Sequence, residues 1–335
     1  MQALQLKKYG GLDHVAFAEL PRPTPGPGEL LVRVHAVGLN PIDNLIPKGD
    51  FKPILKTRLP ATLGSDLAGV VVAVGSGATR FTVGDAVYAS IFDTPHGSLA
   101  KFAVVPEQAA ALKPANLDFV QAASIPMVGL TAWQAMHERM RLRPGQKVFI
   151  PAGSGGIGTF AIQLAKHLGA RVGTTTSTAN VALVRGLGAD EIIDYTQQPF
   201  EQVLRDYDAV LGTLRGDGLE KAMRIVKPGS RVVSLIGPPD LAFASARGMH
   251  VVLRLVFGLL SRKIIGLARR RGASYAFHFV RPDGGQLAQI AALVEAGSIR
   301  PVIDQVFPFL EAKQALACLA QGRARGKVVV RMSVP

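Results

Sequence analysis

Short apolar runs separated by glycine and proline turns fill the first 120 residues. Residues 29–40 (ELLVRVHAVGLN) alternate in places between apolar and polar positions, and they follow PRPTPGPG, which is too rich in proline and glycine for a helix. Two further segments, 67–89 and 98–112, contain similar short runs, with VGSG and VGD as turn signals between them. This pattern predicts a small closed sheet of mainly antiparallel strands.

From about residue 121 the hydrophobic period changes, and strands begin to alternate with helices. Helical spacing over 122–142 precedes a short buried strand at 147–152, a helix that ends near 170 and a strand at 171–177. The alternation continues with helices at 180–189 and 218–226 and strands at 191–195, 208–214 and 231–237. Strands separated by helices predict a parallel, doubly wound sheet.

The last fifty residues add helices at 285–297 and 310–322 and strands near 302–309 and 326–332, without an internal repeat. A length of 335 residues, with 48% hydrophobic and 19% charged residues, is typical of about two globular domains with sizeable cores. The expected fold class is therefore α/β, with a strand-rich unit and a doubly wound unit.

Cysteine usage and hydropathy indicate a cytoplasmic protein without a membrane span. Cys318 is the single cysteine, so an intrachain disulfide is impossible and a reducing compartment is favoured. The uncharged run from Val148 to Ala165 has the length of a span, but it contains four glycines together with Ser154, Thr159 and Gln163. A strand, a turn and a helix explain this run better.

The formal charge of +14 is concentrated in one segment. Residues 241–285 contain eight basic residues and one acidic residue, a net formal charge of +7. Nucleic acid or an anionic membrane surface can use such a patch, but aromatic residues that would stack on bases are few there. We favour a basic helical insertion near 245–275. It is expected to pack against the cleft or a second subunit, with its arginines in solvent. The apolar positions expected to make this contact are Val251, Val252, Leu255, Leu259 and Ile264.

The stretch GSGGIG at 153–158 lies between the strand at 147–152 and a helix. In the pattern GxGxxG, the first glycine makes a tight turn, the second lets a pyrophosphate approach the backbone, and the third lets helix and strand pack closely. Gly153, Gly155 and Gly158 occupy these positions. The order of strand, turn, helix and second strand predicts dinucleotide binding, with a purely structural glycine turn as the alternative.

Residues at the end of the second strand distinguish the two nicotinamide dinucleotides. NAD-binding versions place Asp or Glu there, whereas this chain has the hydroxyl-rich TTTST at 174–178. A 2′-phosphate would meet no carboxylate, and Ser177 and Asn180 can donate to it, with Arg185 as a nearby charge. NADPH is therefore the expected cofactor. The threonines also favour a strand whichever cofactor binds.

The chain resembles the zinc-independent quinone oxidoreductases of the medium-chain dehydrogenase/reductase superfamily, and among them the alkenal/enone reductases. The resemblance rests on seven stretches that span nearly the whole chain. These are GELLVRVHAVGLNPID (28–43), LPATLGSDLAGVVVAVGSG (59–77), FTVGDAVYA (81–89), SIPMVGLTAWQAM (124–136), AGSGGIGTFAIQLAKHLGA (152–170), LGADEIIDY (187–195) and GRARGKVVVRM (322–332).

The resemblance implies a GroES-like β-barrel catalytic domain and a doubly wound Rossmann cofactor domain. The catalytic domain is expected at 1–122, completed by 280–335, and the NADPH-binding domain at 123–279. Relatives are commonly dimers, so a homodimer is expected.

The resemblance also assigns site residues. It places Asn40, Asp43 and Thr131 by the nicotinamide and the substrate. Asn40 and Asp43 can instead cap turns, and Tyr195 can be an ordinary strand aromatic. The positions expected to contact the cofactor are Gly153, Ser154, Gly155, Gly156, Ile157 and Gly158 at the pyrophosphate, Ser177 and Tyr195 at the 2′-phosphate, and Gly237 and Phe279 along the cofactor.

No metal site is expected, because the single cysteine cannot supply the ligands of zinc-using relatives and the seven histidines show no ligand spacing. The expected reaction is hydride transfer from NADPH to the double bond of an α,β-unsaturated carbonyl. Reduction of quinones is the alternative, although many quinone reductases carry a tyrosine shortly after the NxxD pattern, where this chain has Leu45 and Ile46. An NADPH sensor that binds RNA or a membrane surface is an alternative of another class. The partner is otherwise a small electrophile, with nucleic acid disfavoured.

Overall fold

The computed structural model describes residues 1–55 and 57–332. The chain divides into two compact units. Unit 1 comprises Met1–Leu130 together with Arg281–Pro335, and unit 2 comprises Thr131–Val280. Each unit contains its own sheets and core.

The main sheet of unit 1 has seven strands, and it depends on both ends of the chain. Its strands follow the order β15-β16-β3-β5-β6-β8, and β7 also pairs with β3. These strands are β3 (Glu29–Gly38), β5 (Asp66–Val74), β6 (Ala86–Ser90), β7 (Phe102–Pro106), β8 (Ala110–Leu112), β15 (Ile303–Pro308) and β16 (Lys327–Arg331). Pairing is antiparallel except between β15 and β16, so most of the expected antiparallel pattern is observed. Because β16 pairs with β3, the C-terminal segment completes the N-terminal sheet.

A second, three-stranded sheet of unit 1 has the order β2-β1-β4. Its strands are β1 (Gln2–Leu6), β2 (Val15–Glu19) and β4 (Ala61–Thr62). The helices of unit 1 are α1 (Pro41–Lys48), α2 (Phe119–Ala123), α10 (Gly284–Glu295) and α11 (Ala312–Ala320). Alternate residues of the strands bury apolar side chains in one core that also takes in α11 through Ala312, Ala315 and Leu316.

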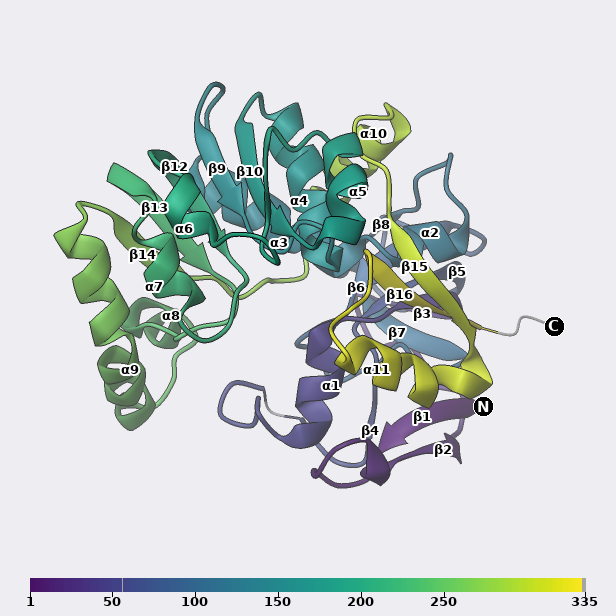
Figure 1. Cartoon of the computed structure of the whole chain (residues 1–335). Helices are drawn as coiled ribbons and strands as arrows, with labels where there is room; N and C mark the ends of the chain where they lie inside the picture. The colour runs from purple at the N-terminus through teal and green to yellow at the C-terminus, as the bar shows by residue number, and fades with distance from the viewer. Residues whose placement is uncertain (56, 333–335) are drawn as a thin grey trace. The chain divides into compact units, whose positions relative to one another are not determined.

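Unit 2 contains a six-stranded parallel sheet with the order β11-β10-β9-β12-β13-β14 (Figure 1). Numbered along the unit, this order is 3-2-1-4-5-6, which is the doubly wound arrangement expected from the alternating pattern. The strands are β9 (Lys147–Ile150), β10 (Arg171–Thr176), β11 (Glu191–Asp194), β12 (Tyr207–Gly212), β13 (Val226–Ser234) and β14 (Ser274–Phe277).

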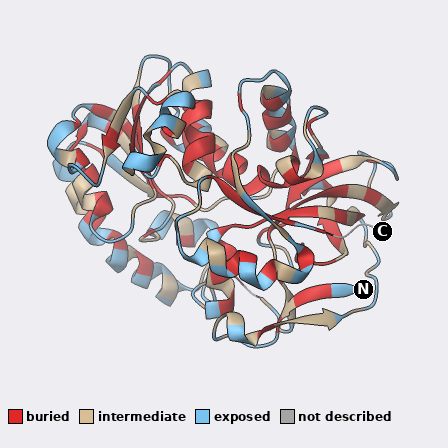
Figure 2. Ribbon diagram, turned by 45° about the vertical axis from the view of Figure 1, so that its right-hand side comes forward, coloured by how far each residue is buried: buried red, intermediate tan, exposed pale blue. Residues whose placement is uncertain are grey.

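Helices connect these strands. The central strands β9, β10 and β12 are largely buried, whereas the edge strands β11 and β14 each have one buried residue; Figure 2 shows burial along the chain. The helices are α4 (Gly156–His167), α5 (Val181–Gly186), α6 (Phe200–Val203), α7 (Gly218–Ala222), α8 (Leu241–Ala246) and α9 (Val251–Arg270). The core of unit 2 includes Phe149 of β9 packed against Phe200 and Tyr207.

The single helix expected at 122–142 is instead three segments. These are α2, α3 (Pro126–Trp133) and a π-helical stretch at Gln134–Met140. Pro126 explains the first break, because a proline disfavours helical geometry in the residue before it while fitting the first turn of the next helix. The helix expected at 218–226 is also shorter, since β13 already begins at Val226.

The basic segment contains the long helix α9, and within the chain itself the expected packing is observed at one position. Of the five apolar residues expected to be packed, only Ile264 is buried, whereas Val251, Val252, Leu255 and Leu259 are exposed. The buried side of α9 instead carries Phe257, Ser261, Ile264 and Ala268. The helix is apolar on more than one side, so spacing alone did not identify the packed side. Within residues 1–55 and 57–332, no helix has the length and apolar character needed to cross a bilayer.

Candidate cofactor and substrate sites

The glycine turn follows β9 directly and opens α4. Gly153 leaves no room for a side chain, because a Cβ there would lie 2.1 Å from Thr174 Oγ1 in β10. A Cβ on Gly158 would lie 2.4 Å from the carbonyl oxygen of Ala152, so this glycine lets α4 approach the turn. Gly155 has extended backbone and meets only the Ala152 oxygen, at 3.3 Å. The three glycines therefore occupy the positions that the dinucleotide fingerprint requires.

The turn is held against the end of β10 by backbone and hydroxyl hydrogen bonds. Gly153 N donates to the Thr175 carbonyl at 3.0 Å, and Ala152 N donates to Thr175 Oγ1 at 3.0 Å. Gly156 and Ile157 follow in the first turn of α4, where backbone N–H groups lack helical acceptors. The positive end of this helix is thus available to an anion such as a pyrophosphate.

A cluster of small polar side chains lies at the carboxyl end of β10. Ser154 Oγ accepts hydrogen bonds from Thr176 Oγ1 at 3.1 Å and from Asn180 Nδ2 at 3.3 Å. Asn180 Nδ2 also lies 3.3 Å from Ser177 Oγ. Asn180 Oδ1 is buried and has no hydrogen-bond partner among the described residues. Three of the expected cofactor residues, Ser154, Ser177 and Asn180, are therefore neighbours, with one acceptor unused.

The end of β11 adds Tyr195 and also Asp194, which no sequence pattern had indicated as a site residue. Tyr195 N donates to the Thr176 carbonyl at 3.1 Å, and its side chain is exposed. Asp194 pairs in register with Thr176, and its carboxylate accepts hydrogen bonds from Thr178 and Thr196. The hydrogen bond from Thr178 is the largest influence that holds the pKa of Asp194 below its usual range. A carboxylate therefore lies close to Ser177, although none ends β10 itself.

Gly237 and Phe279 follow β13 and β14, so they lie at the same edge of the parallel sheet as the glycine turn. Gly237 has φ 101°, a left-handed conformation that favours glycine, and its carbonyl accepts a hydrogen bond from Ser234 Oγ at 2.8 Å. The ring of Phe279 packs 5.5 Å from that of Phe243, and the Arg247 guanidinium lies 5.1 Å from its centre. Phe279 is thus part of an aromatic cluster.

Unit 1 contains a buried polar cluster centred on Asn40. Asn40 Nδ2 donates to Ser65 Oγ at 3.0 Å and to Asp66 Oδ2 at 2.9 Å, and it lies 3.3 Å from the Gly38 carbonyl. Asn40 Oδ1 accepts a hydrogen bond from Lys327 Nζ, which also donates to the Leu39 carbonyl at 2.7 Å. The side-chain groups of Asn40 are therefore all engaged within unit 1.

Asp43 joins this cluster from the first turn of α1. Its Oδ2 accepts hydrogen bonds from Asn40 N at 2.8 Å and from Ser65 Oγ at 3.2 Å. Asn40 and Asp43 thus do cap the start of α1, which was the alternative role for both. Each is only 1% exposed. The remaining residue assigned to the reacting centre, Thr131, is buried in α3 and is the first residue of unit 2.

Burial shifts the ionisation of this cluster. Burial raises the pKa of Asp43 to about 7, although the hydrogen bond from Asn40 N–H opposes this shift. Burial also raises the pKa of Asp66 and lowers that of Lys327, and the attraction between their charges, 3.9 Å apart, opposes both changes. Two carboxyl groups and one ammonium group in so little solvent favour a proton on the cluster near neutral pH.

Asp66 and Lys327 belong to the polar cluster around Asn40, although the sequence alone did not indicate either residue. Lys327 is 4% exposed and lies 287 residues from Asn40 in the chain, so no local spacing connects the two. A lysine that begins a strand of three valines was the only available signal. Asp66 lies in the stretch GSD, next to Ser65.

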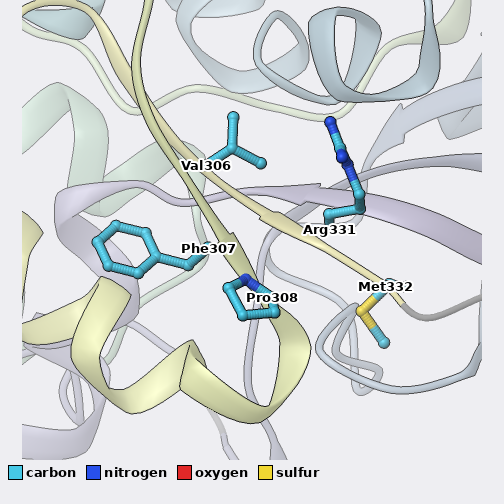
Figure 3. A pocket seen from close by; sticks show the side chains of 5 residues that line it. All are labelled: Val306, Phe307, Pro308, Arg331 and Met332. Carbon is cyan, nitrogen blue, oxygen red and sulfur yellow. The ribbon is translucent and has the colours of Figure 1, made fainter.

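The described residues were also compared with two other kinds of site, a metal centre and a surface pocket in unit 1. Within residues 1–55 and 57–332, no three His, Cys, Asp or Glu side chains converge as metal ligands would. The pocket, of about 270 Å³, lies along β15 and β16 (Figure 3) and has a single charged lining residue, Arg331. Its other lining residues are Val306, Phe307, Pro308 and Met332.

Comparison with known proteins assigns the family. Residues 26–115 match the family "Alcohol dehydrogenase GroES-like domain", and residues 187–330 match the family "Zinc-binding dehydrogenase". The chain is 36% identical to NAD(P)H oxidoreductase RTN4IP1, mitochondrial, from Danio rerio, over 98% of the chain and 91% of that protein. It is 33% identical to NADPH-dependent alkenal/one oxidoreductase, chloroplastic, from Arabidopsis thaliana, over 98% of the chain and 79% of that protein.

Among solved structures, the quinone oxidoreductase from Coxiella burnetii superposes with a TM-score of 0.85 at 29% identity, covering 99% of both chains. This similarity and the family matches confirm the expected fold class, a GroES-like domain with a Rossmann-type domain. The chain therefore belongs to the medium-chain dehydrogenase/reductase superfamily, in the branch that contains quinone oxidoreductases and alkenal/one oxidoreductases.

Proposed function

We propose that the protein is an NADPH-dependent oxidoreductase that reduces the carbon–carbon double bond of α,β-unsaturated ketones and aldehydes. The observation that carries the proposal is the polar end of β10 beside the glycine turn, where Ser154, Ser177 and Asn180 cluster. Among the relatives, an alkenal/one oxidoreductase named as NADPH-dependent supports both the cofactor and the substrate class.

The residues present fit a phosphorylated dinucleotide. The turn has space beside Gly155 where a side chain would otherwise project, and the first N–H groups of α4, which have no helical acceptors, can donate to a pyrophosphate. Ser177 Oγ and Asn180 Nδ2 can donate to a 2′-phosphate, and the buried Asn180 Oδ1 can accept from a ribose hydroxyl. Bound NADPH supplies the hydride, and the protein orients it and excludes water.

Asn40, Asp43 and Thr131 are proposed to act at the substrate end. Since the amide of Asn40 is fully engaged by Ser65, Asp66 and Lys327, we propose that it positions the start of α1 instead of donating to substrate. The acceptor is activated by its own conjugation, because the described residues offer no convergent ligand set for a Lewis acid. Leu45 and Ile46 carry no proton to donate, so the α-carbon is expected to take its proton from solvent.

The experiment compares NADPH oxidation by enones, alkenals, quinones and alcohols. Reduction of enones should give the saturated carbonyl product. With 4R- or 4S-deuterated NADPH, deuterium should appear at the β-carbon from one of the two cofactors only. Label at the carbonyl carbon, or alcohol oxidation as fast as enone reduction, would contradict the proposal.

Quinone reduction is the second candidate, and the similarity to a quinone oxidoreductase from Coxiella burnetii favours it. If quinones alone are reduced in the same panel, this candidate replaces the first.

The proposal includes a homodimer, as the family resemblance implies, in the cytoplasm, which the single cysteine favours. The named relatives include mitochondrial and chloroplastic proteins, so fractionation of the native cells decides the compartment. Light scattering of the purified chain measures the oligomeric state.

A further inference from the structure

The long helix α9 exposes a continuous apolar surface along its first half. Leu255 is 63% and Leu259 69% exposed. Residues four apart are neighbours on a helix, so the exposed side chains form two adjacent rows. One row contains Val251, Leu255 and Leu259, and the other contains Val252, Val256 and Leu260, all of them exposed. We call these six side chains the apolar face of α9.

The opposite side of α9 fixes the helix in unit 2. Phe257, Ser261, Ile264 and Ala268 are buried, and the helix packs against α7, α8 and β14. Ile264 and Ala268 belong to the core of the unit. The apolar face is therefore a second apolar surface of α9, separate from the side that packs in the core of unit 2.

The second half of the same helix presents cations where the first half presents leucine and valine. Arg262 and Lys263 are exposed, as are Arg269, Arg270 and Arg271 at its end. Arg254 is exposed beside the apolar face. Lys263 pairs with Glu220, with 2.6 Å between Nζ and Oε1. Among the residues that the structure describes, none forms an ion pair with Arg254, Arg262, Arg269, Arg270 or Arg271.

We propose that α9 is a docking surface for an anionic lipid bilayer. Acyl chains would cover the apolar face, and acidic headgroups would neutralise the basic half, as in helices that lie in a membrane interface. Residues 241–282 contain no Asp or Glu, so nothing on the segment repels such a surface. A second copy docked through the same face would instead bring two strongly basic segments together, and repulsion between them disfavours that arrangement.

Vesicle flotation tests this surface on the full chain. Vesicles of phosphatidylcholine with about a third phosphatidylglycerol should bind the protein at low salt, whereas vesicles of phosphatidylcholine alone should bind on the order of tenfold less. Raising the salt concentration should weaken the binding, because the Debye length falls from about 10 Å at 0.1 M to about 3 Å at 1 M. If the unchanged chain binds the two kinds of vesicle equally, or binds neither, the proposal is overturned and no variant needs to be made.

Two sets of variants separate the two halves of the helix. Leu255→Gln with Leu259→Gln should weaken binding by about tenfold for each leucine removed from the acyl region. Arg269→Gln with Arg270→Gln should weaken it by about fivefold for each cation and reduce its salt dependence. All four side chains are exposed, so thermal unfolding is expected to change little.

Matched controls lie in unit 1. Leu310→Gln replaces a leucine that is 67% exposed, and Arg323→Gln with Arg325→Gln replaces two exposed arginines. These variants should bind vesicles as the unchanged chain does, and an equal loss in them overturns the assignment to α9.

Two other outcomes also overturn the proposal. One is self-association that the Leu255→Gln, Leu259→Gln variant abolishes while vesicles remain unbound, which assigns the face to a second copy. The other is salt-dependent binding of a single-stranded RNA that only the arginine variant loses, with no vesicle binding, which assigns the segment to nucleic acid.

Discussion

At the residue scale, we expect the end of β10 to determine the choice between NADPH and NADH. Ser177 is half-buried beside Asn180, and the neighbouring carboxylate of Asp194 is held by Thr178 and Thr196. Neutral donors thus stand where an NAD-specific strand ends in a carboxylate, while one negative charge lies a strand away. The preference for NADPH over NADH measures which of the two influences is stronger, the neutral donors or the Asp194 carboxylate.

Ser177→Asp is expected to lower kcat/KM for NADPH by about 100-fold, equivalent to about 2.8 kcal/mol, because a carboxylate would repel the 2′-phosphate. The value for NADH should change much less. Steady-state kinetics with both cofactors measures the effect, and Ser177→Asn is the neutral control. A preference of the unchanged protein for NADH would show that the reading of this strand end is wrong.

The ionisation of Asp43 gives a second residue-scale prediction. Its pKa in the folded chain, about 7, lies above the ordinary value of 3.8, so the folded state binds more protons than the unfolded state between these values. The free energy of unfolding should therefore fall as pH rises from about 4 to about 7, by up to about 4 kcal/mol.

Urea unfolding at several pH values measures this slope. Asp43→Asn, which keeps the shape and cannot ionise, should flatten it, whereas Asp50→Asn at an exposed position should not. An unchanged slope in Asp43→Asn would assign the titration to another group, Asp66 being the first candidate because burial raises its pKa too.

At the element scale, the close approach of α4 to β9 and β10 depends on the absence of side chains in the glycine turn. Both Gly153 and Gly158 face other backbone or side-chain atoms at distances that no Cβ can occupy. The strand, the turn and the helix are therefore one structural unit, and a change in its geometry is expected to alter the proposed pyrophosphate site.

Gly158→Ala should lower the free energy of unfolding by about 1–3 kcal/mol and weaken NADPH binding, because the new methyl group would press on the backbone of Ala152 and Gly153. Gly186→Ala is the matched control, since nothing lies within 4 Å of a Cβ at that position in α5. It should leave NADPH binding unchanged. Thermal unfolding and cofactor fluorescence titration measure the two effects, and equal losses in both variants would contradict the packing argument.

At the scale of the whole molecule, we expect the reaction to need no metal. Cys318 is the only cysteine, and no convergent group of metal ligands occurs among the described residues. The relevant family description nevertheless reads "Zinc-binding dehydrogenase", so the matter calls for a measurement.

Elemental analysis of the purified protein should find no stoichiometric zinc, and treatment with a chelator should leave NADPH-dependent enone reduction unchanged. Bound zinc at one equivalent, with activity lost on its removal and restored on its return, would overturn the metal-free mechanism.

Local spacing in the sequence was enough to predict the doubly wound unit and its glycine turn. The turn, the strand before it and the helix after it lie within residues 147–167, and their geometry depends on glycine positions and hydrophobic period, which are local properties. The resemblance to known motifs added Asn40 and Asp43, which the structure brings together. It did not reveal that both are enclosed in unit 1.

Three features were decided only by tertiary structure. Lys327 reaches Asn40 because β16 pairs with β3. Strands that lie so far apart in the chain share no local sequence pattern from which their pairing could be predicted. Asp194 lies beside the end of β10 because the sheet order is 3-2-1-4-5-6. Contacts with α7, α8 and β14 determine which side of α9 is buried. Because the helix has two apolar surfaces, its own sequence does not show which of them packs in the core.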